Sequence, residues 1–410
     1  MTFGSAAGRG RDRMVPRVLW VVVVLAACKP GAEPDPTAKL DLEAFQRDLA
    51  DNVVLPLYRD FEAAASKLSD AVDAHTGALR TGPADAELRR AREAWADAMK
   101  LWQQAEVLQI GPAGPAKRAA GGQGLRDEIY SWPTVNPCRI DQETVLAKYG
   151  EPDFFSSRLV NVYGLDALEY LLFREDAGND CPSKVAINSK KTWAALGDNE
   201  VRERRAGYAQ AVAEQLAKDA NRLRKAWDKS EGDFVSQLLR AGKPGSVYPK
   251  RRDALSDVFS ALFYLDLRTK DRKLALPLGL SSKCPRATCP DALESPWAKH
   301  SKENIKANLV GFRSVYRGNA TGASKSGYGF DDMLEELGMS ALTKELSEDI
   351  AAAVHAVDEL PDVLGTALES DPEPIRLLHG AVKRVTDKLK GEVVTALSLQ
   401  VPAEAATDID

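Results

Sequence analysis

The repeat of apolar residues between residues 86 and 109 constrains this chain more than any other feature. Leucine, alanine and tryptophan recur there at intervals of three and four residues, from Leu88 through Trp95 to Trp102. That spacing places them on one stripe of an α-helix, and Gly111-Pro112 provides a stop signal. A half-buried strand would instead alternate at every second residue. The chain is therefore expected to build its core from amphipathic helices.

The same spacing recurs along the rest of the sequence. From residue 40 to 78 it predicts one or two helices, with a kink or break at Pro56. Further helices are predicted for residues 159–173, 199–229, 253–268, 301–316, 331–337, 340–360 and 374–396. Almost no stretch has the pattern of a strand pair, so we predict an all-α fold. The length exceeds what one hydrophobic core usually serves, which indicates two helical-bundle halves in tandem, residues 40–195 and 196–400.

The N-terminus has the layout of an export signal. Four arginines precede an unbroken apolar run of ten residues that ends at Ala27. A membrane-spanning helix needs roughly 20 apolar residues, so residues 1–27 fit a cleaved signal peptide. The tetrapeptide LAAC that ends at Cys28 resembles the lipobox of bacterial lipoproteins, whose cysteine is acylated and becomes the first mature residue. We therefore expect a lipid on Cys28 that holds the protein on a membrane of the cell envelope.

The segment after this cysteine predicts how the body is attached. Residues 28–39 contain prolines and a glycine and lack apolar periodicity, which is typical of a tether. Lys29 stands where some Gram-negative bacteria place an aspartate that retains lipoproteins at the inner membrane. The outer membrane is therefore favoured, on its periplasmic side or at the surface.

Charge excludes one class of partner. The formal net charge of the chain is −5, and it becomes −8 when residues 1–27 are removed. Nucleic-acid-binding domains are usually basic, so nucleic acid is not expected as a partner.

Four cysteines follow Cys28, an even number that indicates two disulfides in an oxidising compartment. Three pairings are possible. We favour Cys138 with Cys181 and Cys284 with Cys289, because the second pair closes a short loop flanked by prolines. Zinc binding is the alternative, but the paired C-x-x-C spacing of many zinc sites is absent.

The predicted helix at residues 159–173, LVNVYGLDALEYLLF, holds the most informative polar residues. Asp166 and Glu169 stand three positions apart and share one face of an otherwise apolar helix. Burying a carboxylate is unfavourable unless it is paired, hydrogen-bonded, metal-bound or protonated. Either Arg126 and Arg139 neutralise the two acids in a structural ion-pair network, or the acids bind a metal ion or another ligand.

At these residues the chain resembles the imelysin-like family, whose signature is G-x-H-x-x-E on a buried helix. The segment Gly164-Leu165-Asp166-Ala167-Leu168-Glu169 matches it, except that Asp166 stands where the family usually has histidine. Other motifs agree in order over most of the chain: AREAW at 91–95 with Trp102 and Glu106, Ser131-Trp132-Pro133 with Asn136 and Arg139-Ile140-Asp141, and Trp297 and Ser301 with residues 308–318.

The resemblance implies an all-helical fold of two bundle-like halves in a periplasmic or surface protein associated with acquisition of iron or other metals. The family is also filed as a metallopeptidase clan, M75. Here Asp166 replaces the histidine ligand, and no H-E-x-x-H motif occurs. Zinc hydrolysis is therefore disfavoured and a non-enzymatic role is favoured.

The acids of the motif indicate the kind of metal. Asp166 and Glu169, joined by Glu106 or Asp141, would make an oxygen-rich site suited to hard cations such as Ca²⁺, Mg²⁺, Mn²⁺ or Fe³⁺. The motif segments and their neighbours also supply candidates for a ligand pocket: Arg126, Trp132, Arg139 and His300.

The leading prediction is an envelope lipoprotein that binds a metal ion, iron foremost, or a metal-bearing ligand for uptake. Its partners would be the membrane, through the lipid, and metal-uptake components. A metallopeptidase of the M75 type and a non-catalytic surface interaction protein are the alternatives.

Overall fold

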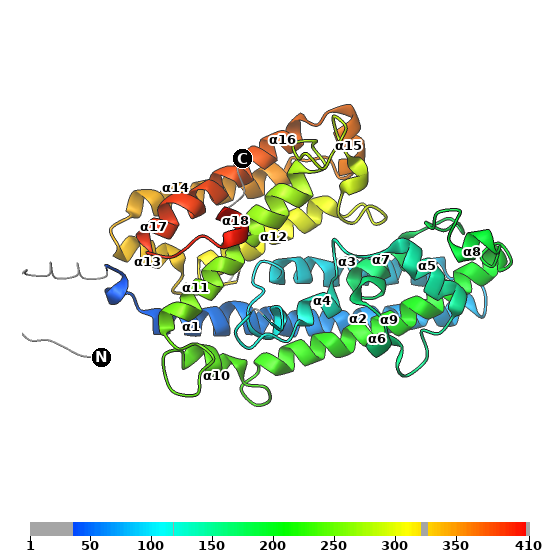
Figure 1. Cartoon of the computed structure of the whole chain (residues 1–410), viewed down its shortest axis with the longest axis horizontal. Helices are drawn as coiled ribbons and strands as arrows, with labels where there is room; N and C mark the ends of the chain where they lie inside the picture. Colours follow the sequence, from blue (N-terminus) through cyan, green and yellow to red (C-terminus); the bar gives the residue numbers. More distant parts are fainter. Residues whose placement is uncertain (1–35, 118, 321–326, 407–410) are drawn as a thin grey trace, which may run out of the picture.

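The computed structural model describes residues 36–117, 119–320 and 327–406, and within these ranges the regular elements are helices and no strand forms (Figure 1). The α-helices are α1 (Leu42–Asp48), α2 (Leu55–Leu79), α3 (Asp85–Ala105), α4 (Leu125–Ile129), α5 (Pro137–Leu146), α6 (Phe154–Ser157), α7 (Leu165–Phe173), α8 (Ala186–Ser189), α9 (Gly197–Trp227), α10 (Phe234–Leu239), α11 (Arg251–Leu262), α12 (Ser301–Tyr316), α13 (Phe330–Glu336), α14 (Ser340–Asp358), α15 (Leu364–Ser370), α16 (Glu373–Lys388), α17 (Val394–Ala396) and α18 (Ala403–Ala406). The π-helices are η2 (Leu49–Val54), η5 (Leu265–Ala275) and η7 (Leu389–Val393), and the 3₁₀-helices are η1 (Pro36–Lys39), η3 (Gly111–Ala113), η4 (Val160–Val162) and η6 (Pro290–Ala292). The predicted all-α class is confirmed.

The first group of helices is built around α2, which packs along both α3 and α9, while α7 packs on α3 and α9. The apolar face of α2 points into the core of this group, where Phe61 and Leu68 are 0% exposed. The ring of Phe61 lies 5.0 Å from the ring of Trp102 on α3. The tryptophan stripe predicted for residues 86–109 thus faces the core of this group.

The second group contains α12, α14, α16 and the π-helix η5, and it lies beside the first group (Figure 1). The two groups meet along α3 and α12. At this contact Gly311 has no space for a side chain, because a Cβ atom there would lie 2.3 Å from the main-chain oxygen of Gln104. Glycine therefore permits the close approach of the two helices.

The predicted boundary between residues 195 and 196 stays a prediction, and the first helix after it packs with the first group. The long helix α9 begins at Gly197, and it packs against α2 and α7 rather than against the second group. One apolar cluster also extends from Leu40 to Ala405 through both groups. The halves share a core, and α10 and α11, which follow α9, both pack against α1.

Two predicted helices differ in their ends for local reasons. The helix predicted from residue 159 begins only at Leu165, because Gly164 has φ +92° and interrupts the helical backbone. The helix predicted for residues 253–268 is divided into α11 and η5. Just before Pro56 the π-helix η2 ends at Val54 and α2 begins at Leu55.

Both predicted disulfides are present, Cys138–Cys181 and Cys284–Cys289. Residues 1–27 and Cys28 lie outside the described residues. The described end of the predicted tether, Pro36–Lys39, forms η1, in which Thr37 is 4% exposed. Among the described helices none combines the length and apolar character needed to cross a membrane.

Candidate functional site

The glycine of the signature fixes how α7 enters the core. Gly164 has φ +92°, a conformation that favours glycine. A Cβ atom there would also lie 2.7 Å from the main-chain oxygen of Ile129, at the end of α4. The N-terminus of α7 is therefore held against the segment that follows α4, which carries Tyr130, Ser131 and Trp132.

Asp166 lies in the first turn of α7 and is 2% exposed. Its Oδ2 accepts hydrogen bonds from the backbone N–H of Ser131 at 3.1 Å and from the Ser131 hydroxyl at 2.7 Å. Its Oδ1 accepts from the N–H of Ala167 at 3.0 Å. Burial raises the pKa of the Asp166 carboxyl to about 7, although these hydrogen bonds favour the charged form and oppose the rise.

Glu169, one turn further along α7, reaches across to the second half of the chain and is 2% exposed. Its Oε1 accepts from the backbone N–H groups of Trp297 and Ala298, both at 3.0 Å. Burial raises the pKa of Glu169 to about 8, and the nearby carboxylate of Glu294 adds to the rise. The protonated form is therefore favoured near neutral pH.

The loop that binds Glu169 has an unusual backbone. Ser295 and Lys299, on either side of the two donating amides, have φ of +53° and +56°. Such conformations are uncommon for residues other than glycine and cost about 1–3 kcal/mol each. The surrounding contacts hold this loop in a shape that directs two amides at one carboxylate oxygen.

The predicted arginine partners bind other acids. Arg126 donates from Nε and Nη2 to the two carboxylate oxygens of Glu106, at 3.0 and 2.8 Å. Arg139 binds Gln142 and Glu143 at 3.0 and 3.2 Å. Among the described residues neither arginine is hydrogen-bonded to Asp166 or Glu169, although the positive charge of Arg126 opposes the rise that burial causes in the pKa of Asp166.

A polar cluster that the sequence did not predict joins the two halves beside the signature. Lys273 on η5 lies 2.9 Å from Oε2 of Glu294, and it donates to Gln103 and Asn308 at 2.7 Å each. The hydroxyl of Tyr130 donates to Oε1 of Glu294 at 2.6 Å. Lys273 occurs in a charged stretch, LDLRTKDRK, whose pattern is typical of a solvated face, so no local signal marked its burial.

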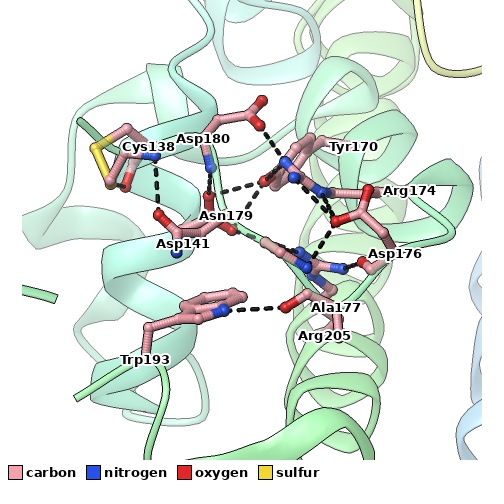
Figure 2. Close-up of polar contacts among 12 residues, drawn as sticks. Cys138, Asp141, Tyr170, Arg174, Asp176, Ala177, Asn179, Asp180, Trp193 and Arg205 are labelled. Atoms are coloured by element: carbon pink, nitrogen blue, oxygen red, sulfur yellow. Dashed lines mark hydrogen bonds and ion pairs between the residues drawn. A yellow bond between two sulfur atoms is a disulfide. The ribbon is translucent and has the colours of Figure 1, made fainter. Parts of the chain in front are cut away.

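Asp141 belongs to a third polar cluster, shown in Figure 2. It accepts from the hydroxyl of Tyr170 at 2.9 and 2.8 Å and from the N–H of Asp180 at 2.8 Å, and Arg205 lies 3.8 Å away. Burial raises the pKa of Asp141 to about 6. The Cys138–Cys181 disulfide connects α5 to the segment that carries Asp180.

The remaining pocket candidates pack against neighbouring side chains. Trp132 is 9% exposed, and the ammonium group of Lys273 lies 5.4 Å from the centre of its ring. The imidazole of His300 lies edge-on to Trp95, with 5.4 Å between ring centres.

The four acids predicted as metal ligands are thus distributed over separate networks. Glu106 is bound by Arg126 and Asp141 by Tyr170, whereas Asp166 and Glu169 remain together on α7. Over the described ranges no three His, Cys, Asp or Glu side chains form a group that could hold a metal ion. Of the four acids, Asp166 and Glu169 therefore share one helix, whereas Glu106 and Asp141 belong to other networks.

Comparisons with known proteins agree with this architecture. The family model of imelysin, peptidase family M75, matches residues 54–390. A protein of Synechococcus elongatus named iron-regulated protein A is 25% identical over 348 residues, which are 84% of this chain and 83% of that protein.

Two solved structures share the fold. One, described as an iron-regulated protein A precursor from Parabacteroides distasonis, has a TM-score of 0.67 and 18% identity, and the match covers 90% of this chain and 97% of that one. An imelysin-like protein from Psychrobacter arcticum has a TM-score of 0.64 and 17% identity, with 88% and 98% covered. Because the family model spans most of the sequence, this chain belongs to the imelysin family, M75.

Proposed function

We propose that this protein is an iron-related envelope lipoprotein that binds a hard metal cation, or a chelate of one, through Asp166 and Glu169. One observation carries the proposal: the two carboxylates are buried on the same helix, and no basic side chain of the described residues is hydrogen-bonded to either. Buried acids without a basic partner are favoured only when they are protonated, hydrogen-bonded or bound to a cation.

The chemistry of the two acids suits exchange between protons and a cation. Their raised pKa values, about 7 for Asp166 and about 8 for Glu169, mean that both hold protons readily near neutral pH. A cation that binds would displace these protons. Carboxylate oxygens are ligands for hard cations such as Fe³⁺, Mn²⁺ and Ca²⁺.

Two carboxylates leave most coordination positions of such a cation unfilled. Water or the oxygen atoms of a chelator would complete the shell, as hard cations often retain several non-protein ligands. The site therefore suits a cation that arrives with other ligands bound. The names of two similar proteins, iron-regulated protein A of Synechococcus elongatus and an iron-regulated protein A precursor of Parabacteroides distasonis, favour iron as the metal.

Cys28 would supply the membrane attachment. The preceding residues have the lipobox pattern LAAC, and the body after residue 36 is folded as one unit with its own core. Outer-membrane attachment would place the site where incoming metal is met by uptake components. Incorporation of labelled palmitate into the full chain tests the anchor, and labelling that persists in Cys28→Ser would refute it.

Isothermal titration calorimetry tests the metal site. The full chain is titrated with Fe³⁺ as a soluble chelate, and with Fe²⁺, Mn²⁺, Ca²⁺ and Zn²⁺, in two buffers of different ionisation enthalpy. We expect binding of one ion per chain with proton release, and a loss of at least about tenfold in affinity in Asp166→Asn/Glu169→Gln.

Asp141→Asn is the matched control, because Asp141 is a buried acid of the same half that is bound by Tyr170. It should keep wild-type affinity. The absence of binding by any ion, or equal affinity in the double variant, would refute the proposal. Chelator-sensitive cleavage of an unfolded protein that disappears in Glu169→Gln would assign the site to hydrolysis instead.

A further inference from the structure

A pocket whose lining includes neither of the signature acids lies at the end of the first group. It has a volume of about 510 Å³ and is formed by the end of α2, the start of α3, the end of α7 and the start of α9. Its lining includes four arginines, Arg92, Arg174, Arg202 and Arg205. Small-molecule sites typically enclose about 300–1,000 Å³, so the pocket is large enough for a small ligand.

Two of these guanidinium groups are held in place by neighbouring groups that do not line the pocket. Arg174 donates to the hydroxyl of Tyr170 at 2.6 Å and to Asp176 at 3.1 Å (Figure 2). Arg205 donates to the backbone oxygens of Asp176 and Gly178, and its side chain is 5% exposed. Because both side chains are already fixed, a ligand would immobilise them at little further cost in entropy.

Polar atoms remain unpaired within the lining. Nε of Arg205 and Nδ1 of His75 are buried and have no hydrogen-bond partner in the part of the chain that the structure describes. The two residues are 4% and 7% exposed. A buried polar atom without a partner is unfavourable, and both residues line the pocket. A ligand with several acceptor oxygens would satisfy the Arg205 donor, and His75 would donate in the tautomer that carries the proton on Nδ1.

The rim adds positive charge that is weakly paired. Arg202 is exposed, its guanidinium contacts Asn199 at 3.3 Å, and no ion pair to it is found among the described residues. Arg92 lies 3.8 Å from Glu175, which is 84% exposed. Glu175 and Asp85 are the acids of the lining, against four arginines. Asp85 lies at the N-terminus of α3, where the helix dipole also favours anions.

We propose that this pocket binds a small oxyanion with two or more negative charges, a di- or tricarboxylate or a phosphate, between Arg92 and Arg202 at the rim and Arg205 and His75 inside. The planar guanidinium presents paired donors that match both carboxylate and phosphate oxygens. Carboxylates and phosphates share this chemistry, and the choice of probe in the titration distinguishes between them.

Calorimetric titration of the metal-free full chain with citrate, succinate, inorganic phosphate and sulfate tests the proposal, with acetate as the singly charged control. We expect one site for at least one multiply charged anion, with no heat from acetate at equal concentration. Added salt should weaken the binding. A response to carboxylates alone identifies an organic acid as the ligand class, and a response to phosphate alone identifies a phosphate.

Arg202→Gln should lower the affinity about tenfold, because it removes a charged hydrogen-bond donor. Arg222→Gln is the matched control: Arg222 is exposed on the same helix, α9, and does not line the pocket. His75→Leu should also weaken binding, with circular dichroism to confirm folding.

The proposal fails if no multiply charged anion binds. It also fails if Arg202→Gln binds the anion as tightly as the wild type and the control Arg222→Gln do. Asp166→Asn/Glu169→Gln should leave anion affinity unchanged. The outcome is therefore independent of the metal site.

Discussion

The substitution Glu169→Gln tests the electrostatic description of the signature most directly. A glutamine Oε1 can accept the same two backbone N–H groups, from Trp297 and Ala298, that now bind the carboxylate at 3.0 Å. Glutamine also has nearly the shape of protonated glutamic acid but cannot lose a proton. The variant therefore keeps the packing and removes only the titration of this residue.

The magnitude follows from the pKa of Glu169, which burial raises from 4.5 to about 8. Below about pH 4.5 the residue is protonated in both the folded and the unfolded chain. Between pH 4.5 and 8 the unfolded chain loses this proton while the folded chain keeps it. The free energy of unfolding then falls by up to about 1.4 kcal/mol per pH unit. Over three and a half pH units the loss reaches at most about 5 kcal/mol, and above pH 8 it is complete.

Urea unfolding followed by tryptophan fluorescence, in the presence of a chelator and at pH 5 to 9, measures the effect. All other titrating groups are common to both proteins, so the difference between wild type and Glu169→Gln isolates residue 169. The variant should gain several kcal/mol relative to wild type between pH 5 and 8.5. Parallel stability curves for the two proteins would refute the reasoning.

Glu106→Gln is the matched control, since Glu106 is also fully buried but is bound through both oxygens by Arg126. Removing one partner of a buried ion pair costs about 3–5 kcal/mol. This variant should therefore be less stable than wild type at pH 7, which is the opposite sign to Glu169→Gln at high pH.

The two disulfides should contribute unequally. Replacing both cysteines of Cys138–Cys181 by serine opens a loop of sequence separation 43, at about 4 kcal/mol, whereas Cys284–Cys289, of separation 5, should contribute about 2 kcal/mol. Thermal melts under non-reducing conditions measure both, and equal losses would contradict the estimate. Lys273→Met leaves the buried carboxylate of Glu294, which lies 2.9 Å from the Lys273 ammonium group, without its basic partner. We therefore expect the free energy of unfolding in urea to fall by about 3–5 kcal/mol. A variant as stable as wild type would show that this pair is not ionised in the folded protein.

Local sequence signals were sufficient to place most helices. The helix α12 begins at Ser301 and ends at Tyr316, as predicted, because its apolar spacing is uninterrupted. The helix around the signature was predicted six residues too long at its start. Residues 159–163 are apolar or aromatic apart from Asn161, but Gly164 adopts a positive φ, and composition alone does not distinguish a helical glycine from one that interrupts the helix.

Local sequence signals could not predict contacts between segments that lie far apart in the chain. Glu169 is bound by amides 128 and 129 residues further along the chain, and Lys273 reaches Gln103 over 170 residues. Only the packed structure shows that α9, which begins just after the predicted boundary between residues 195 and 196, lies along α2. The short disulfide loop, by contrast, was predictable because its two cysteines are five residues apart.

The carboxylate of Asp166 has enough acceptor atoms for the hydrogen-bond donors that surround it. The imidazole of the histidine that the family signature has at this position would have fewer. Oδ2 of Asp166 accepts from both the N–H and the hydroxyl of Ser131, and Oδ1 accepts from Ala167. A neutral imidazole offers one acceptor nitrogen, so histidine here would leave buried donors unpaired, at about 1–3 kcal/mol each. Ser131 and the N–H of Ala167 therefore satisfy both oxygens of the carboxylate at position 166. It follows that any cation held by the signature in this chain meets oxygen ligands from both of its polar positions, which favours hard cations over zinc.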